Sequence, residues 1–183
     1  MTTSEPSTSQ SVSPLSDSDD SQCAYHEHFM AEALLEAAKA DQRNEVPVGA
    51  VVVLNDVIIG RGFNQPISAC DPTAHAEVVA LRDAARHIQN YRLADATLYV
   101  TIEPCTMCAG AIVHSRVGRV VYGASEPKAG VVASQEQLFT KPYFNHTLEV
   151  LGGVMEAQCS AAIQQFFQRR REEKRLAKEA AKK

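Results

Sequence analysis

The sequence predicts an α/β domain, because short apolar segments alternate along the chain with segments of helical periodicity. The chain has 183 residues, enough for one ordinary domain with tails, and 45% of them are hydrophobic, which is ample for a core. No apolar run approaches the roughly 20 residues that a membrane span requires. We therefore expect one layered domain between two tails of different composition.

The first tail is expected to be disordered and to span residues 1–24. It holds eight serines, few large apolar side chains and a net charge of −4. It contains no Lys or Arg and no apolar stretch after a basic region, so neither a transit peptide nor a secretory signal is expected. The sequence contains five cysteines, an odd number that fits a reducing compartment better than a disulfide framework. We therefore predict a cytoplasmic protein.

The next elements form a helix followed by a hairpin. An apolar face at helical spacing predicts a helix over about residues 25–41. Residues 48–54 are nearly all apolar, as expected of a strand that is buried on both faces. Asn55 and Asp56 then predict a short turn into a second strand, residues 57–62, which makes the pair antiparallel.

Two strand–helix units and a final helix follow. Asp71, Pro72 and Thr73 combine a capping side chain with an early proline and predict the start of a helix that ends near residue 88. Residues 124–146 are expected to be irregular or briefly helical. The other segments, in the order strand, helix, strand, strand and helix, are expected at residues 97–102, 105–114, 117–123, 148–151 and 155–171.

The C-terminal segment is strongly basic. From Arg169 onward it contains eight basic and three acidic residues, a net charge of +5. A nucleic-acid contact and a plain solvated face both fit such a charge run. We therefore expect a domain over residues 25–172 and a basic tail, helical or disordered, over residues 173–183.

Two short motifs supply metal ligands. His75 and Glu77 form an H-x-E motif, and Cys105 and Cys108 form P-C-x-x-C with the preceding proline. Zinc prefers nitrogen and sulfur ligands, and three protein ligands leave one corner of its tetrahedron for water, as in catalytic sites. We predict that His75, Cys105 and Cys108 bind one Zn²⁺ per subunit and that Glu77 is the catalytic acid/base.

The positions of these residues in their helices support one common site. His75 and Glu77 are two residues apart, about 200° around a helix, so they converge only beyond its N-terminal end. Cys105 and Cys108 are three residues apart and share a helix face. We infer that two helix N-termini point at one metal ion, where their partial positive charge favours thiolates.

The separate motifs leave alternatives open. Taken alone, the Cys105–Cys108 pair also fits a thioredoxin-like redox site. A fourth protein ligand, such as His114 or Cys70, would indicate a non-catalytic, zinc-stabilised RNA-binding module. The joint pattern of both motifs is the signature of zinc nucleobase deaminases, and it gives Glu77 a role that the alternatives lack.

Longer stretches of the sequence resemble the bacterial tRNA-specific adenosine deaminase family over roughly residues 25–172. The resemblance implies a three-layer α/β/α cytidine deaminase-like fold with a mixed five-stranded sheet. The C-terminal pairs Asn145-His146 and Phe166-Phe167 also fit it. The main matching runs are Gly-Phe-Asn-Gln-Pro at 62–66, Asp-Pro-Thr-Ala-His-Ala-Glu at 71–77, Glu-Pro-Cys-Thr-Met-Cys-Ala-Gly-Ala at 103–111 and His-Ser-Arg-Val-Gly-Arg-Val-Val-Tyr-Gly-Ala at 114–124.

The resemblance also implies an activity and partners. The family hydrolytically deaminates the wobble adenosine of a tRNA anticodon loop to inosine, usually in an arginine tRNA, and is typically homodimeric. Asn64 matches the family's substrate-contacting asparagine, whereas its local sequence alone favours a turn residue. Glu103 either supports a metal ligand or supplies a charge at a helix start. The rival activity is deamination of a free base or nucleoside, such as guanine or cytosine, on the same fold.

Contacts to RNA phosphates must be local, because the part of the chain between the two tails is acidic. The loop at residues 125–130 has glutamate and proline where many family members carry aspartate and a small residue, which concerns sequence context more than reaction. The possible RNA contacts are Glu126, Lys128, Arg116, Arg169 and Arg170.

Overall fold

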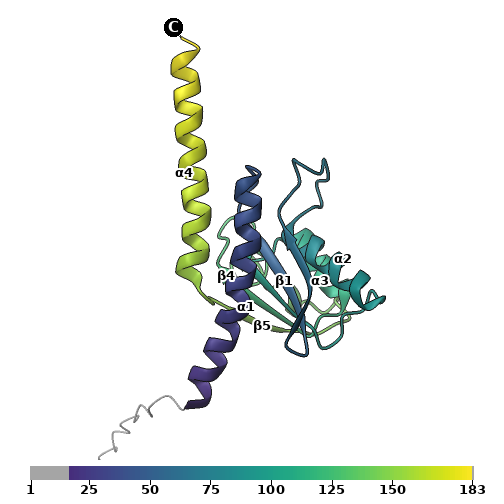
Figure 1. Ribbon diagram of the computed structural model, residues 1–183. Coiled ribbons are helices and arrows are strands. Elements are labelled where there is room, and N and C mark those ends of the chain that lie inside the picture. Colours follow the sequence, from purple (N-terminus) through teal and green to yellow (C-terminus); the bar gives the residue numbers. More distant parts are fainter. Residues whose placement is uncertain (1–16, 183) are drawn as a thin grey trace, which may run out of the picture.

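A computed structural model of the chain describes residues 17–182 (Figure 1). It contains a five-stranded sheet in the order β2-β1-β3-β4-β5. Strand β1 is antiparallel to β2 and β3, whereas β3, β4 and β5 run parallel, so the sheet is mixed. The strands are β1 (Gly49–Leu54), β2 (Val57–Phe63), β3 (Thr97–Ile102), β4 (Arg119–Ala124) and β5 (Glu149–Gly152).

Helices cover both faces of this sheet. Helices α2 (Ala76–Ile88) and α3 (Thr106–Ser115) pack on one face, and α1 (Asp17–Gln42) packs on the other. Helix α4 (Glu156–Ala180) begins beside α1, and its C-terminal half projects beyond the domain (Figure 1). The predicted three-layer α/β/α fold with a mixed five-stranded sheet is confirmed.

Strand β1 illustrates why the sequence folds this way. Ala50 and Val52 contribute to the core under α2 and α3, whereas Val51 and Val53 contribute to the core under α1. Side chains alternate across a strand, so a strand between two helical layers must be apolar at every position. The all-apolar run that predicted a doubly buried strand is therefore explained by the two layers.

The turn of the predicted hairpin has the expected geometry. Asn55 and Asp56 both have positive φ angles, 51° and 63°. Two successive residues with positive φ form the type I′ turn, whose twist matches that of the flanking strands. Asn and Asp adopt this conformation more readily than most residues.

Two predicted helix starts differ from the structure. Helix α1 begins at Asp17 rather than near residue 25. The predicted disorder of residues 17–24 is therefore wrong. The rest of the predicted disordered tail, residues 1–16, lies outside the described residues. Residues 21–25 are all exposed, so no buried face reveals the helix in the sequence. Helix α2 begins at Ala76, with His75 as its N-cap, rather than near Asp71.

The segment before α2 forms a separate turn instead. The Asp71 carboxylate accepts hydrogen bonds from the Thr73 backbone N–H and hydroxyl at 2.8 and 2.7 Å. Side chains that bond their own backbone in this way compete with helix formation. The Asp71 side chain thus does bond the backbone as a cap would, but it closes a turn before the helix, and His75 is the N-cap of α2.

Close packing of α2 on β2 predicts a large effect of one substitution. A Cβ atom at Gly62 would overlap the Ala76 carbonyl oxygen and the Ala80 nitrogen of α2. We expect Gly62→Ala to lower the free energy of unfolding by about 1–3 kcal/mol, because α2 must move off the sheet. Denaturant unfolding measures this change. Gly110→Ala is the control, since nothing lies within 4 Å of a Cβ there, and it is expected to be neutral or stabilising by up to ~1 kcal/mol.

No helix among residues 17–182 is both long enough and apolar enough to cross a membrane.

Candidate active site

The predicted site residues meet at one edge of the sheet. Strand β1 runs against the other four strands, so the edge at its beginning is also where β2, β3 and β4 end. Asn64 follows β2, Glu103 follows β3, and Glu126 comes soon after β4. Together with His75 and Glu77 they line a cavity of about 280 Å³. In open α/β sheets, ligands commonly bind outside the carboxyl ends of the strands.

Three potential metal ligands converge in this cavity region. His75 is the N-cap of α2 and Cys105 is the N-cap of α3, so two helix N-termini meet there as predicted. His75 Nδ1 lies 3.8 Å from Cys105 Sγ and 3.5 Å from Cys108 Sγ. All three ligand atoms lie within 4.8 Å of one another.

These distances fit a tetrahedral zinc ion. At the usual Zn–S and Zn–N bond lengths, ligand atoms on one tetrahedron lie roughly 3.5–3.8 Å apart. Nδ1 is the His75 atom that faces the sulfurs, so His75 would coordinate through Nδ1. The described residues thus hold a set of donors whose identity and spacing suit zinc.

The two thiols differ in charge state. Hydrogen bonds from the Cys108 thiol and from His75 lower the pKa of Cys105 to about 3. The same hydrogen bond to Cys105, together with burial, raises the pKa of Cys108. The thiolate form is therefore favoured at Cys105 and the thiol form at Cys108, and metal binding requires both cysteines as thiolates.

Glu77 lies in the first turn of α2, beside the ligand group but outside it. Its side chain is buried, and burial raises the pKa of the Glu77 carboxyl above its ordinary value. A raised pKa makes a carboxylate a better proton acceptor, as a general base requires. The positive charge of a metal ion would lower this pKa again.

Asn64 links the end of β2 to the start of α2. It is buried, and its Oδ1 accepts a hydrogen bond from the Ala76 backbone N–H at 2.9 Å. A first-turn N–H of a helix has no partner within the helix, so this contact fixes the N-terminal end of α2. It leaves the Asn64 NH₂ group as a donor on a residue that lines the cavity.

The two residues considered as a fourth ligand lie elsewhere. Among residues 17–182, the group with metal-binding geometry contains His75, Cys105 and Cys108 but neither Cys70 nor His114. Cys70 is exposed, and His114 lines a different hollow, between α2 and α3. The described residues therefore offer three ligands, the number typical of a catalytic zinc site.

Comparison with known proteins shows the family to which this chain belongs. Residues 24–124 match the model of the cytidine and deoxycytidylate deaminase zinc-binding region. The chain is also 54% identical over 156 residues to a tRNA-specific adenosine deaminase of Haemophilus influenzae, covering 84% of this chain and 90% of that protein. The chain belongs to the tRNA-specific adenosine deaminase family. The matched family model is a zinc-binding region, and this deaminase uses zinc as its cofactor.

Solved structures agree with this placement. A structure from studies of A-to-I editing by tRNA:A34 deaminases at the wobble position of transfer RNA superposes with a TM-score of 0.72 at 44% identity, covering 74% of this deaminase and 98% of that chain. The guanine deaminase of Bacillus subtilis superposes with a TM-score of 0.54 at 35% identity, covering 68% of this chain and 82% of that chain. The fold and the sequence thus agree better with the tRNA:A34 deaminase structure.

The predicted RNA contacts near the cavity have different surroundings. Glu126 lines the cavity of the deaminase, and Lys128 is exposed two residues further along the same loop. Arg116 lies at the C-terminal end of α3, about 15 Å along the helix from the metal ligands, and donates to the Asn145 carbonyl oxygen at 2.8 Å. Of these three residues, only Glu126 lines the cavity, and Lys128 lies in the same loop.

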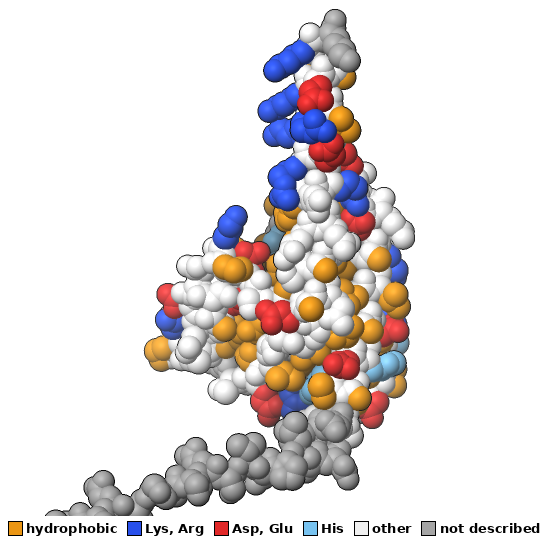
Figure 2. Space-filling model, turned by 90° about the vertical axis from the view of Figure 1, so that its left-hand side faces the viewer, with side chains coloured by type: hydrophobic (Ala, Val, Ile, Leu, Met, Phe, Trp, Pro, Cys, Tyr) orange, Lys and Arg blue, Asp and Glu red, His pale blue; other side chains and the backbone are white. Residues whose placement is uncertain are grey.

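The predicted RNA contacts on α4 already have partners. Arg169 pairs with Asp41 of α1 at 2.8 Å, and Arg170 pairs with Glu173 at 2.7 Å. Both pairs are exposed, and such pairs contribute little stability. Figure 2 shows Lys and Arg side chains gathered along the projecting end of α4.

Several residues of the site were not predicted. Val46, Val48, Pro66, Ile102 and Ala129 supply the apolar lining of the cavity. Most of them adjoin strand ends on the same edge, which the strand-end rule for α/β sheets would have indicated. Glu45 was also not predicted. It is 1% exposed, and its carboxylate accepts a hydrogen bond from the Ser68 backbone N–H at 2.7 Å. This hydrogen bond holds the loop that contains Pro66.

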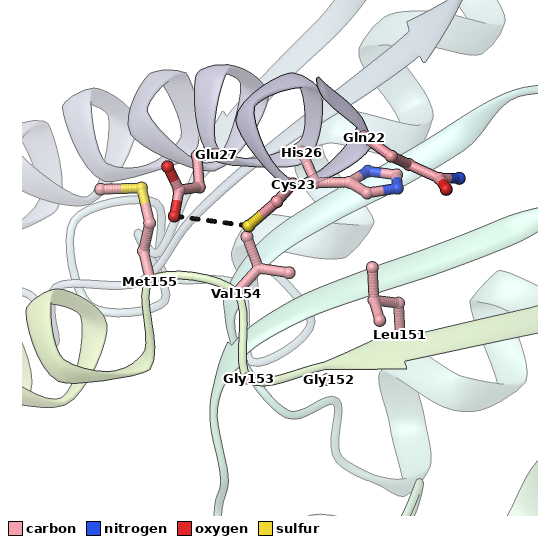
Figure 3. A pocket seen from close by; sticks show the side chains of 9 residues that line it. All are labelled: Gln22, Cys23, His26, Glu27, Leu151, Gly152, Gly153, Val154 and Met155. Atoms are coloured by element: carbon pink, nitrogen blue, oxygen red, sulfur yellow. Dashed lines mark hydrogen bonds between the residues drawn. The ribbon is translucent and has the colours of Figure 1, made fainter. Parts of the chain in front are cut away.

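A second cavity lies apart from the ligand group. Figure 3 shows it between the N-terminal part of α1 and the connection from β5 to α4. Its lining includes Cys23, His26 and Leu151, and the Cys23 thiol lies 3.8 Å from a Glu27 carboxylate oxygen. None of the predicted site residues lines this cavity.

Proposed function

We propose that this chain converts the wobble adenosine of a tRNA anticodon loop to inosine by hydrolytic deamination. The observation that carries the proposal is the three-ligand group with a buried carboxylate beside it, in a chain of the tRNA-specific adenosine deaminase family. Bases of an anticodon loop are unpaired and can be turned out into a pocket, unlike bases within an A-form duplex.

His75, Cys105 and Cys108 are the residues that would hold the zinc ion. When bound, zinc supplies a Lewis acid that makes water nucleophilic near neutral pH. Glu77 takes a proton from the water that attacks C6 of adenine and delivers it to the neighbouring ring nitrogen. Glu77 then transfers a proton to the departing amino group, so that adenosine and water yield inosine and ammonia.

Asn64 is proposed to orient the nucleoside. Its oxygen is occupied by the Ala76 N–H, so its NH₂ group is available to donate to an acceptor on the nucleoside. The apolar lining, which includes Val48 and Ile102, excludes water from the faces of the base. A cavity of about 280 Å³ lies near the lower end of the range for small-ligand sites, in keeping with one nucleoside rather than a larger ligand.

The test is incubation of the purified zinc-loaded chain with the anticodon stem-loop of an arginine tRNA, scored for inosine at the wobble position. We expect conversion of the stem-loop and little conversion of free guanine, cytosine or adenosine. Turnover of a free base without conversion of the stem-loop would replace this proposal by the rival activity on the same fold.

Local electrostatic contacts are expected to make RNA binding depend on salt. Lys128→Ala is expected to weaken stem-loop binding and to reduce the slope of log affinity against log salt by about one, because one phosphate contact is lost. Titrations at several salt concentrations measure the slope. The control is Lys39→Ala: Lys39 pairs with Glu36 on α1, against the sheet face opposite to α2 and α3, and we expect an unchanged slope. An unchanged slope in Lys128→Ala would count against the contact.

The RNA is proposed to extend beyond the cavity to Arg116, Arg169 and Arg170, with Glu126 at the cavity wall. We further propose that residues 25–172 form the deaminase domain and that residues 173–183 act as its basic tail. Two copies are proposed to form a homodimer on one arginine tRNA in the cytoplasm, in keeping with the family resemblance. Light scattering of the purified chain, with and without stem-loop RNA, tests the dimer.

A further inference from the structure

Glu103 is a buried carboxylate outside the ligand group, and it accepts hydrogen bonds from five donors. Glu103 is 2% exposed and lies between β3 and the metal-binding segment. Its Oε2 accepts the Glu126 backbone N–H at 3.0 Å and the Ser134 hydroxyl. Its Oε1 accepts the backbone N–H groups of Val132, Ala133 and Ser134 at 3.0, 2.8 and 2.9 Å.

All of these donors belong to the β4–η1 loop, residues 125–137, which joins β4 to the short 3-10 helix η1 (Leu138–Thr140). An ionised carboxylate offers about four lone-pair positions and no donor, so Glu103 is saturated by this loop. Its hydrogen bonds are charge-assisted and therefore stronger than neutral ones. A glutamine here would turn its NH₂ group toward N–H donors in either orientation, so the match depends on the carboxylate.

The packing of the loop on Glu103 gives a second, independent observation. A Cβ atom at Gly130 would overlap the Glu103 carboxylate, so the loop approaches it as closely as a glycine allows. Gly130 also forms a β-bridge with Cys105, and the Val131 N–H donates to the Pro104 carbonyl oxygen at 3.1 Å. The loop is thus seated on the segment that carries the metal ligands.

The same loop forms one wall of the candidate active site. Glu126 and Ala129 line the cavity together with Asn64, His75 and Glu77. The position of this wall sets the width of the cavity for the nucleoside. We propose that Glu103 is a positioning residue that fixes the β4–η1 loop as the wall against which the target nucleoside binds. This inference rests on the proposed function and goes beyond it by giving Glu103 a role in substrate binding.

The test compares Glu103→Gln with wild type in three measurements. We expect the KM for the anticodon stem-loop to rise roughly tenfold or more while kcat stays within about threefold, because substrate binding is affected more than the chemical step. Zinc content is expected to stay at the wild-type level. Hydrogen exchange is expected to speed up at residues 126 and 132–134 and to stay unchanged in β3.

The matched control is Glu36→Gln. Glu36 is also 2% exposed and accepts hydrogen bonds from Lys39 and Arg61, but it lies on α1, against the other face of the sheet. We expect this variant to lose stability without a change in KM. An equal rise of KM in both variants would reduce Glu103 to a general structural role and overturn the inference.

Other outcomes also decide the inference. Wild-type KM and wild-type exchange in Glu103→Gln would overturn it, and so would loss of zinc, which would assign Glu103 to the metal site. If Glu103→Gln does not fold, Ser134→Ala replaces it, since it removes one hydroxyl donor and keeps the four backbone donors. We then expect about a threefold rise of KM, and no rise would overturn the inference. Wild type that makes no inosine would defeat the proposed function, while hydrogen exchange would still decide whether Glu103 fixes the loop.

Discussion

Glu77→Ala is expected to lose at least a factor of about 10²–10⁴ in kcat while the protein keeps its zinc. A general acid/base typically contributes that much, and Glu77 is proposed to serve more than one proton transfer in the same turnover. Glu77 lies outside the His-Cys-Cys group, so its removal leaves all three ligands in place. Single-turnover assays on the stem-loop measure the rate, and elemental analysis measures zinc per chain.

Glu77→Gln is the companion variant for this prediction. It keeps the size of the buried side chain but cannot carry the proton, so its loss of kcat is expected to approach that of Glu77→Ala. Stem-loop affinity is expected to change little in either variant. Near-normal turnover in a zinc-containing Glu77→Ala protein would contradict the role given to this residue.

Cys108→Ala is expected to abolish both zinc binding and activity. Cys108 is fully buried, and its sulfur is one of the three ligand atoms, so two remaining ligands hold the ion poorly. The apparent stability is also expected to fall, because zinc stabilises the folded chain by mass action only if it binds. Zinc content, inosine formation and thermal unfolding with and without a chelator measure these effects.

Cys70→Ala provides the matched control for the loss of a cysteine. Cys70 is exposed and does not belong to the ligand group, so zinc content and activity are expected to match wild type. Loss of zinc in Cys70→Ala would make Cys70 a fourth ligand and would favour the non-catalytic module. Retention of zinc and activity in Cys108→Ala would contradict the ligand set.

Much of the site could be predicted because its residues form short motifs with a characteristic spacing. The spacings of His75 to Glu77 and of Cys105 to Cys108 are short-range features, and together with the predicted helix starts they indicated that each pair lies near a helix N-terminus. The structure confirms that these N-termini meet, with His75 Nδ1 at 3.8 and 3.5 Å from the two sulfurs. Strands β1, β3 and β4 likewise follow from apolar runs, because burial between two layers requires them, whereas β5 is exposed at all four positions.

The unpredicted features depend on contacts between distant parts of the chain. The donors to Glu103 lie 23 to 31 residues away, in a loop whose course no local pattern specifies. Arg169 and Asp41 are separated by 128 positions, so their ion pair depends on how α4 packs beside α1. The early start of α1 was missed for another reason, since residues 21–25 are exposed and carry no apolar periodicity.

The central claim is that the polypeptide donates three atoms to zinc and leaves the fourth position to water. X-ray absorption spectroscopy of the zinc-loaded protein tests it most directly. We predict two sulfur ligands at about 2.3 Å, one imidazole nitrogen at about 2.0–2.1 Å and one further light atom that is not an imidazole nitrogen. A third sulfur or a second imidazole would mean a closed, four-ligand structural site and would contradict the account.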